Sequence, residues 1–318
     1  MLTLLIQVYH VETEIPASLP DFYDKLFNAV FIKHDGIKPG FERERYSGLS
    51  ATKLQKLFDA FCFMVLQSDA GRTLTNREFS ESFHKAIKYT PASACELEGF
   101  KKDIVTVACL MLNDGFEQTS FLHKSIIEYH AASFIQNSSD DFAAKFYQHA
   151  PMNYETWAET LTFLGYIDEF RYGNLYVLQE YPPALERLSL VLSQRTPESL
   201  ISYLEFQLPN FNVVLEGTRP KVFTTDPFSR QHSFTNSILF AVVDNLHETL
   251  PQTSNINIQK AIRQTPKIER SVGINIKAMV THIDQSVLWE RLSEIERTLS
   301  SKVDKYKTIV STEMKKHE

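Results

Sequence analysis

Apolar residues recur at helical spacing along most of this chain. Between residues 50 and 107 three such runs follow one another, with apolar positions three or four residues apart. Two of the runs follow a Thr/Ser-x-x-Glu pattern, Thr75 with Glu78 and Ser93 with Glu96, which is typical of the capping box at the start of a helix. The pattern therefore predicts three short consecutive helices in this region.

Another helix is predicted nearer the N-terminus. Ser18 can act as its N-cap, Pro20 fits its first turn, and Asp21 lies where the helix dipole favours a negative charge. Residues 1–9 are also apolar, but no capping residue precedes them. We interpret the chain as the C-terminal part of a longer protein, and the alternative is a small protein whose first helix starts here.

Residues 111–122 carry the signal of a β-hairpin. The sequence Asn113-Asp114-Gly115 separates two short strand-like segments, and Asn, Asp and Gly tolerate the positive φ that tight hairpin turns need. Three helices followed by a two-stranded wing describe a winged-helix domain. The next segment, FLHKSIIEYHAASFI at residues 121–135, places His123 where the ribbon passes into a helix.

The remainder of the chain is predicted to be mostly helical. After a polar break at residues 137–141 the helical pattern continues to about residue 192, whereas Pro and Gly interrupt residues 207–236, which can form only short strands or extended segments. From Leu288 to Val310 an apolar stripe repeats in eleven-residue steps, close to the natural period of an α-helix. This predicts a long amphipathic helix that packs on its own domain or, alternatively, on a second copy.

These patterns together predict a mainly α fold. We expect a helical domain, a winged helix with a small β-hairpin wing, and a helical C-terminal domain that ends in a long amphipathic helix. The expected boundaries are residues 1–47, 48–136, 137–282 and 283–318.

Charge argues against nucleic acid as the partner. The chain carries 33 basic and 39 acidic residues, a net charge of −6, whereas nucleic-acid binding needs a basic face. The third predicted helix, which would enter the major groove, presents Glu96, Glu98 and Asp103 against Lys101 and Lys102. A winged-helix DNA-binding regulator therefore stays only as a second alternative.

No pattern in the sequence indicates catalysis. There is no GxxxxGK[ST] or GxGxxG phosphate loop and no G-x-S-x-G elbow. His123, Glu128 and His130 do not have zinc-ligand spacing, and the three cysteines, Cys62, Cys95 and Cys109, have no CxxC pair. We expect a cytoplasmic protein without metal, without a membrane span and without a reaction of its own.

Residues 121–135 resemble the winged-helix signature of NACHT-type signal-transduction (STAND) NTPases, which include NOD-like receptors and bacterial antiphage relatives. The likeness lies in an aromatic residue, then His123, then Ser125, Glu128-Tyr129 and Ala131-Ala132. Upstream, LTLLIQVY, IPASLPDFYDKLF and HDGIKPGFERER are similar to the helical domain that follows the nucleotide-binding fold in bacterial members. The resemblance covers residues 1 to about 136.

The resemblance implies a mechanism for His123. In the resting state of such proteins the winged helix folds back on the nucleotide, and this histidine donates a hydrogen bond to the β-phosphate of ADP. Exchange for ATP releases the winged helix and permits oligomerisation. The alternative for His123 is a hydrogen bond to backbone where the wing meets the helix.

The chain departs from the family because it contains no Walker A or Walker B motif. We therefore expect no cofactor for this chain alone. ADP or ATP would belong to the intact protein, and the partner would be a NACHT nucleotide-binding domain in cis or in trans. The expected function is the regulatory and sensing half of such a switch, by resemblance in antiphage defence. The alternative is a stand-alone interaction or decoy protein that docks on NACHT-type partners.

Overall fold

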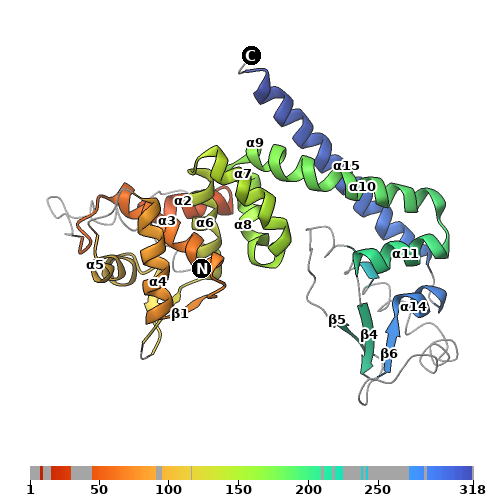
Figure 1. The fold of residues 1–318 in the computed structure, drawn as a ribbon, viewed down its shortest axis with the longest axis horizontal. Coiled ribbons are helices and arrows are strands. Elements are labelled where there is room, and N and C mark those ends of the chain that lie inside the picture. The colour runs from red at the N-terminus through yellow and green to blue at the C-terminus, as the bar shows by residue number, and fades with distance from the viewer. Residues whose placement is uncertain are drawn as a thin grey trace. The chain divides into compact units, whose positions relative to one another are not determined.

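The computed structural model confirms a mainly helical fold with a small antiparallel sheet and a long C-terminal helix (Figure 1). It describes residues 8–9, 16–29, 45–90, 95–115, 117–208, 211–216, 219–224, 238, 241–242, 272–282 and 285–316. The chain divides into two compact units, residues 1–146 with 156–169, and residues 147–155 with 170–318. In the part of the chain that the structure describes, no helix has the length and apolar character that crossing a membrane requires.

The first unit contains the predicted winged helix. Its elements are α2 (Leu19–Asn28), α3 (Ala51–Gln67), β1 (Thr73–Thr75), α4 (Asn76–Ala86), α5 (Leu97–Lys102), β2 (Met111–Asn113), β3 (Gln118–Phe121), α6 (Lys124–Gln136) and, reaching across its boundary, α7 (Asp140–His149) and α8 (Tyr154–Ile167). The sheet has the order β1-β3-β2, with Thr73 opposite Ser120 and Met111 opposite Phe121. The hairpin was predicted, whereas the third strand, β1, was not.

Capping residues explain where these helices begin. Ser18 accepts a hydrogen bond from the Asp21 N–H, and Thr75 and Glu78 form both halves of a capping box, so these two predictions are confirmed. The prediction at Ser93 is wrong, because α5 begins at Leu97 with Glu96 at its N-cap and no side-chain cap bond. Ser93 itself lies outside the described residues.

Phenylalanines fill the core of the winged helix. Phe61 of α3 lies 4.7 Å from Phe79 of α4 and 5.3 Å from Phe100 of α5, measured between ring centroids. Phe58 and Phe121 complete the cluster, which joins α3 to the sheet. Edge-to-face and tilted pairs of this kind add stabilisation beyond the apolar area that they bury.

Residues 45–49, which precede α3, pack against one face of α5. A Cβ atom on Gly99 would lie 2.6 Å from the Tyr46 carbonyl oxygen, so only glycine permits this approach. The Asp103 carboxylate accepts hydrogen bonds from the Tyr46 and Ser47 N–H groups at 2.9 and 3.0 Å. Asp103 is therefore buried, which corrects the prediction that it lies on an outward-facing surface.

The second unit combines helices with a small three-stranded antiparallel sheet. Its further elements are α9 (Glu169–Tyr172, which belongs to this unit from Phe170 onward), α10 (Leu178–Gln194), α11 (Pro197–Gln207), β4 (Phe211–Glu216), β5 (Arg219–Thr224), β6 (Val272–Asn275), α14 (Ile276–His282) and α15 (Ser286–Met314). The sheet has the order β5-β4-β6, so the strands suggested within residues 207–236 are present.

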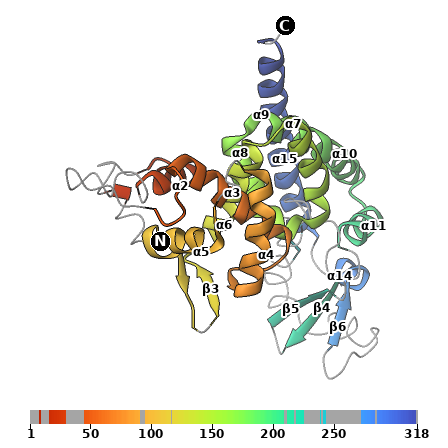
Figure 2. The same ribbon diagram turned by 60° about the vertical axis from the view of Figure 1, so that its left-hand side comes forward.

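The long helix α15 packs inside its own unit, as Figures 1 and 2 show. Its eleven-residue stripe is buried at Leu288, Leu292, Leu299, Val303, Tyr306 and Val310. Tyr306 of α15 packs against Gly173, in a one-turn π-helix at residues 173–177. Glycine permits this close approach, because a Cβ atom at that position would lie only 2.6 Å from the Tyr306 ring. Lys302 of α15 donates hydrogen bonds to the hydroxyls of Tyr172 and Tyr181 at 3.2 and 3.1 Å.

Candidate functional site

His123 lies at the junction that the sequence singled out, between β3 and α6. Its backbone is extended, with φ −147° and ψ 145°, and it is the N-cap of α6. The ring nitrogen Nδ1 accepts a hydrogen bond from the Ser125 backbone N–H at 3.2 Å, which satisfies one of the free N–H groups at the start of the helix. The Ser125 hydroxyl also contacts Nδ1.

This arrangement fixes how His123 presents its second ring nitrogen. Because Nδ1 accepts the Ser125 N–H, the proton of a neutral ring belongs on Nε2. The side chain is exposed, and Nε2 has no partner among the residues that the structure describes. His123 therefore offers an outward-facing N–H donor at the N-terminus of a 13-residue helix.

Tyr23 of α2 contacts the residues at the start of α6. Its hydroxyl bonds to the Ser125 hydroxyl, and its ring stacks on Tyr129 of α6 with centroids 5.3 Å apart. Burial raises the pKa of Tyr23. Helix α2 thus holds the side chain that orients His123, although the two segments are far apart in sequence.

Glu128 lies one turn into α6 from the same junction. Its carboxylate pairs with Lys124 at 3.1 Å, yet the residue is only 4% exposed. Burial raises the pKa of Glu128, while the neighbouring charges of Lys124 and His123 act in the opposite direction. The charge of Glu128 is consequently linked to that of His123.

A second histidine of α6 has the opposite environment. His130 is completely buried, and its Nδ1 lies 2.6 Å from Oδ1 of Asp59 on α3. The Ser133 hydroxyl donates to the other carboxylate oxygen of Asp59 at 2.8 Å. Nε2 of His130 has no hydrogen-bond partner among the described residues, and the rings of Phe27 and Phe58 lie against the imidazole.

Neither histidine belongs to a metal centre in the described part of the chain. The described residues contain no group of three or more His, Cys, Asp or Glu side chains that could hold an ion. The three cysteines are free, Cys62 and Cys95 being buried and Cys109 exposed.

The helix that would read DNA is poorly placed for that role. Helix α5 is six residues long, and its two lysines have partners inside the domain. Lys101 donates to the Asn76 side chain at 2.9 Å, and Lys102 lies 4.5 Å from the Tyr46 ring centroid. Contacts to phosphates would have to break these interactions.

Sequence reasoning located His123 but missed the residues that position it. Ser125 has a local signal, since a polar residue two positions after an N-cap can share the cap. No local signal marks Tyr23, Asp59 or His130, because their roles depend on partners that are distant in the sequence and on burial in the folded domain. The apolar run at residues 1–9, apart from Val8 and Tyr9, and most of the basic segment 33–45 lie outside the described residues.

Comparison with known proteins does not assign this site. No family model, no curated protein and no solved structure matches the chain.

Proposed function

We propose that this chain is the regulatory and sensing half of a NACHT-like nucleotide-dependent switch. In this proposal the winged helix docks on a NACHT nucleotide-binding domain, and His123 donates a hydrogen bond from Nε2 to a phosphate of the bound nucleotide. The observation that carries the proposal is the outward Nε2–H of His123, held by Ser125 at the start of α6.

The local electrostatics suit a phosphate. The N-terminal end of a helix carries a partial positive charge and unpaired N–H groups, so an anion is stabilised there. Lys124, the next residue after His123, has a side chain that is 62% exposed, and its ammonium group pairs with Glu128.

The partner has to supply the rest of the nucleotide site. The sequence has no phosphate-binding loop, and the exposed side chains at the start of α6 are those of His123 and Lys124. The role in antiphage defence rests on the family resemblance of residues 1 to about 136 alone.

The test is the affinity of this chain for the NACHT nucleotide-binding domain encoded nearest to it in its own genome. That domain is loaded with ADP or with a non-hydrolysable ATP analogue, and binding is measured by calorimetry. We expect tighter binding to the ADP form. His123→Ser keeps a cap acceptor for Ser125 N–H but cannot reach a phosphate, so it should weaken binding to the ADP form about tenfold.

The matched control is His84→Ser. His84 is also an exposed histidine of the winged helix whose Nδ1 is held by a neighbour, the Ser80 carbonyl oxygen at 2.7 Å, but it lies near the end of α4. Its substitution should leave the affinity unchanged. Equal losses for the two variants, or no difference between ADP and ATP forms, would contradict the proposal.

A further inference from the structure

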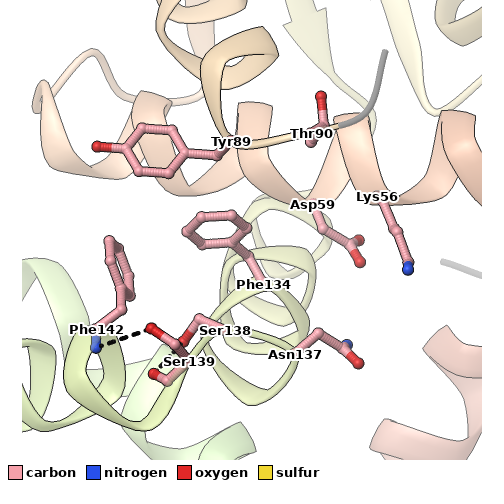
Figure 3. Close-up of a pocket in the computed structure, with 9 residues that line it drawn as sticks. All are labelled: Lys56, Asp59, Tyr89, Thr90, Phe134, Asn137, Ser138, Ser139 and Phe142. Atoms are coloured by element: carbon pink, nitrogen blue, oxygen red, sulfur yellow. Dashed lines mark hydrogen bonds between the residues drawn. The ribbon is translucent and has the colours of Figure 1, made fainter.

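A pocket of about 320 Å³ opens at the other end of α6, between α3, the 3-10 turn at residues 87–89 and the start of α7 (Figure 3). This volume is at the lower end of the range for small-molecule sites. The pocket lies wholly in the first unit and does not include His123.

One half of the pocket is aromatic. Phe134 lies 6.0 Å from Tyr89 and 5.4 Å from Phe142 between ring centroids, and both pairs are edge-to-face. Tyr89 and Phe142 are also 6.0 Å apart. The three rings support one another and form a firm apolar wall, although Tyr89 remains 56% exposed.

The other half carries two opposite charges from α3. Asp59 is 5% exposed, and His130 and Ser133 hold its two oxygens from behind. A carboxylate has about four acceptor sites, so His130 and Ser133 leave two of them unused. Lys56, one turn earlier, is exposed and forms no ion pair among the described residues.

A neutral polar group faces these charges. Asn137 lies across the pocket from Lys56 and Asp59 in Figure 3. Its amide nitrogen donates to the Ser133 carbonyl oxygen at 2.8 Å, which fixes the amide and leaves its oxygen as an acceptor.

We infer that this pocket binds a free α-amino acid with an apolar side chain. The ligand's ammonium group would pair with Asp59 and the Asn137 oxygen, its carboxylate with Lys56, and its side chain with the wall of Tyr89, Phe134 and Phe142. Residues three apart on a helix have their Cβ atoms about 5–6 Å apart, a separation that a group with adjoining ammonium and carboxylate can bridge.

Ligands with one charge fit the same lining less well. An amine without a carboxylate leaves Lys56 without its partner, and a carboxylate without an amine faces the carboxyl group of Asp59. A metal ion would find one carboxylate, already bonded to His130 and Ser133. The inference does not rest on the role proposed for His123, because the two sites share no residue.

The test is a calorimetric or NMR titration of the whole chain with four free amino acids: L-phenylalanine, L-tyrosine, L-leucine and L-methionine. Phenethylamine and 3-phenylpropionate, which each lack one charged group of phenylalanine, are titrated alongside. We expect saturable binding of at least one amino acid at or below about 1 mM. Removing either charged group of phenylalanine should weaken its binding about tenfold or more.

Two lysine variants locate the site. Lys56→Met should weaken binding of the amino acid about tenfold and leave that of phenethylamine unchanged, because the amine has no carboxylate to lose. Lys53→Met, a change of another exposed lysine of α3, should have no effect on either. The inference is overturned if none of the four amino acids binds, if both analogues bind as tightly as phenylalanine, or if the two lysine variants behave alike.

Discussion

The histidine that caps α6 and the histidine inside α6 form clusters that are similar in part of their composition and opposite in character. Each cluster combines a histidine and a serine of α6 with a residue from another helix: the N-cap His123 and Ser125 with Tyr23 of α2, and His130 and Ser133 with Asp59 of α3. His123 is exposed, and its Nε2 has no partner in the described part of the chain, whereas His130 is buried and holds a carboxylate in place. Environment, rather than residue type, therefore distinguishes the histidine that is a candidate for ligand binding from the histidine with a structural role.

The largest effect should come from removing the buried histidine. His130→Ala leaves the buried Asp59 carboxylate without one of its two partners and removes an imidazole packed between Phe27 and Phe58. We expect the free energy of unfolding to fall by about 3–5 kcal/mol. Urea denaturation measures it, with His84→Ala as the exposed control, expected within about 0.5 kcal/mol of the original chain. Equal effects for the two would break the comparison.

A smaller loss is expected at the serine of the buried cluster. Ser133→Ala removes the hydroxyl that donates to Asp59 at 2.8 Å and leaves that oxygen without its donor. The free energy of unfolding should fall by about 1–3 kcal/mol. Ser311→Ala, at an exposed serine of α15, serves as the control, since its hydroxyl donates to the Thr308 carbonyl of its own helix. A loss of the same size at Ser311 would show that burial of the cluster is not the cause.

The exposed cluster should matter for stability only through its cap. His123→Ala removes the acceptor for the Ser125 N–H, and loss of an N-cap side chain costs about 0.5–2 kcal/mol. His123→Ser supplies another cap oxygen and should recover most of that loss. The comparison is sharpened if Ser restores stability in denaturation while partner binding remains weak. If Ser is as unstable as Ala, the histidine does not act as a cap.

The smallest effect concerns the acid between the two histidines. Burial raises the pKa of Glu128, so the folded chain binds this proton more tightly than the unfolded chain does. The contribution of Glu128 to stability is therefore most favourable below its unfolded value of 4.5 and falls as pH rises through the higher folded pKa. Glu128→Gln should remove that part of the slope of unfolding free energy against pH.

The same carboxylate also reports on His123. The positive charge of His123 lowers the pKa of Glu128, so His123→Ala should raise it further. NMR titration of the Glu128 carboxyl carbon measures the change, and His84→Ala should produce none. A pKa of Glu128 that is the same in the original chain and in His123→Ala would mean that the two groups are not coupled.

The fold was predictable wherever local chemistry determines it. The caps at Ser18 and Thr75, the turn after Asn113 and the apolar stripe of α15 are set by neighbours in the sequence, and each appears in the structure. Strand β1 escaped prediction because its three residues gain their conformation from pairing with β3, more than 40 positions later. Asp103 was predicted to be a surface acid, because the residues next to it in the sequence do not indicate its hydrogen-bond partners, the N–H groups of residues 46 and 47.

The candidate site was predictable only in part, for the same reason. The position of His123 at a strand-to-helix junction follows from local sequence, but its orientation depends on Tyr23 of α2 through Ser125. The burial of His130 and its bond to Asp59 depend on the packing of α3 against α6. Spacing could reject a shared metal for the two histidines, but it could not distinguish which of them is exposed.

The most direct test follows the ring nitrogens of both histidines by NMR while the ADP-loaded NACHT nucleotide-binding domain is added to the isotope-labelled chain. The proposed function predicts that the Nε2 resonance of His123 shifts on binding, that it shifts less with the nucleotide-free domain, and that His130 stays unchanged. Binding of the ADP-loaded domain with no shift at His123 Nε2 would contradict it.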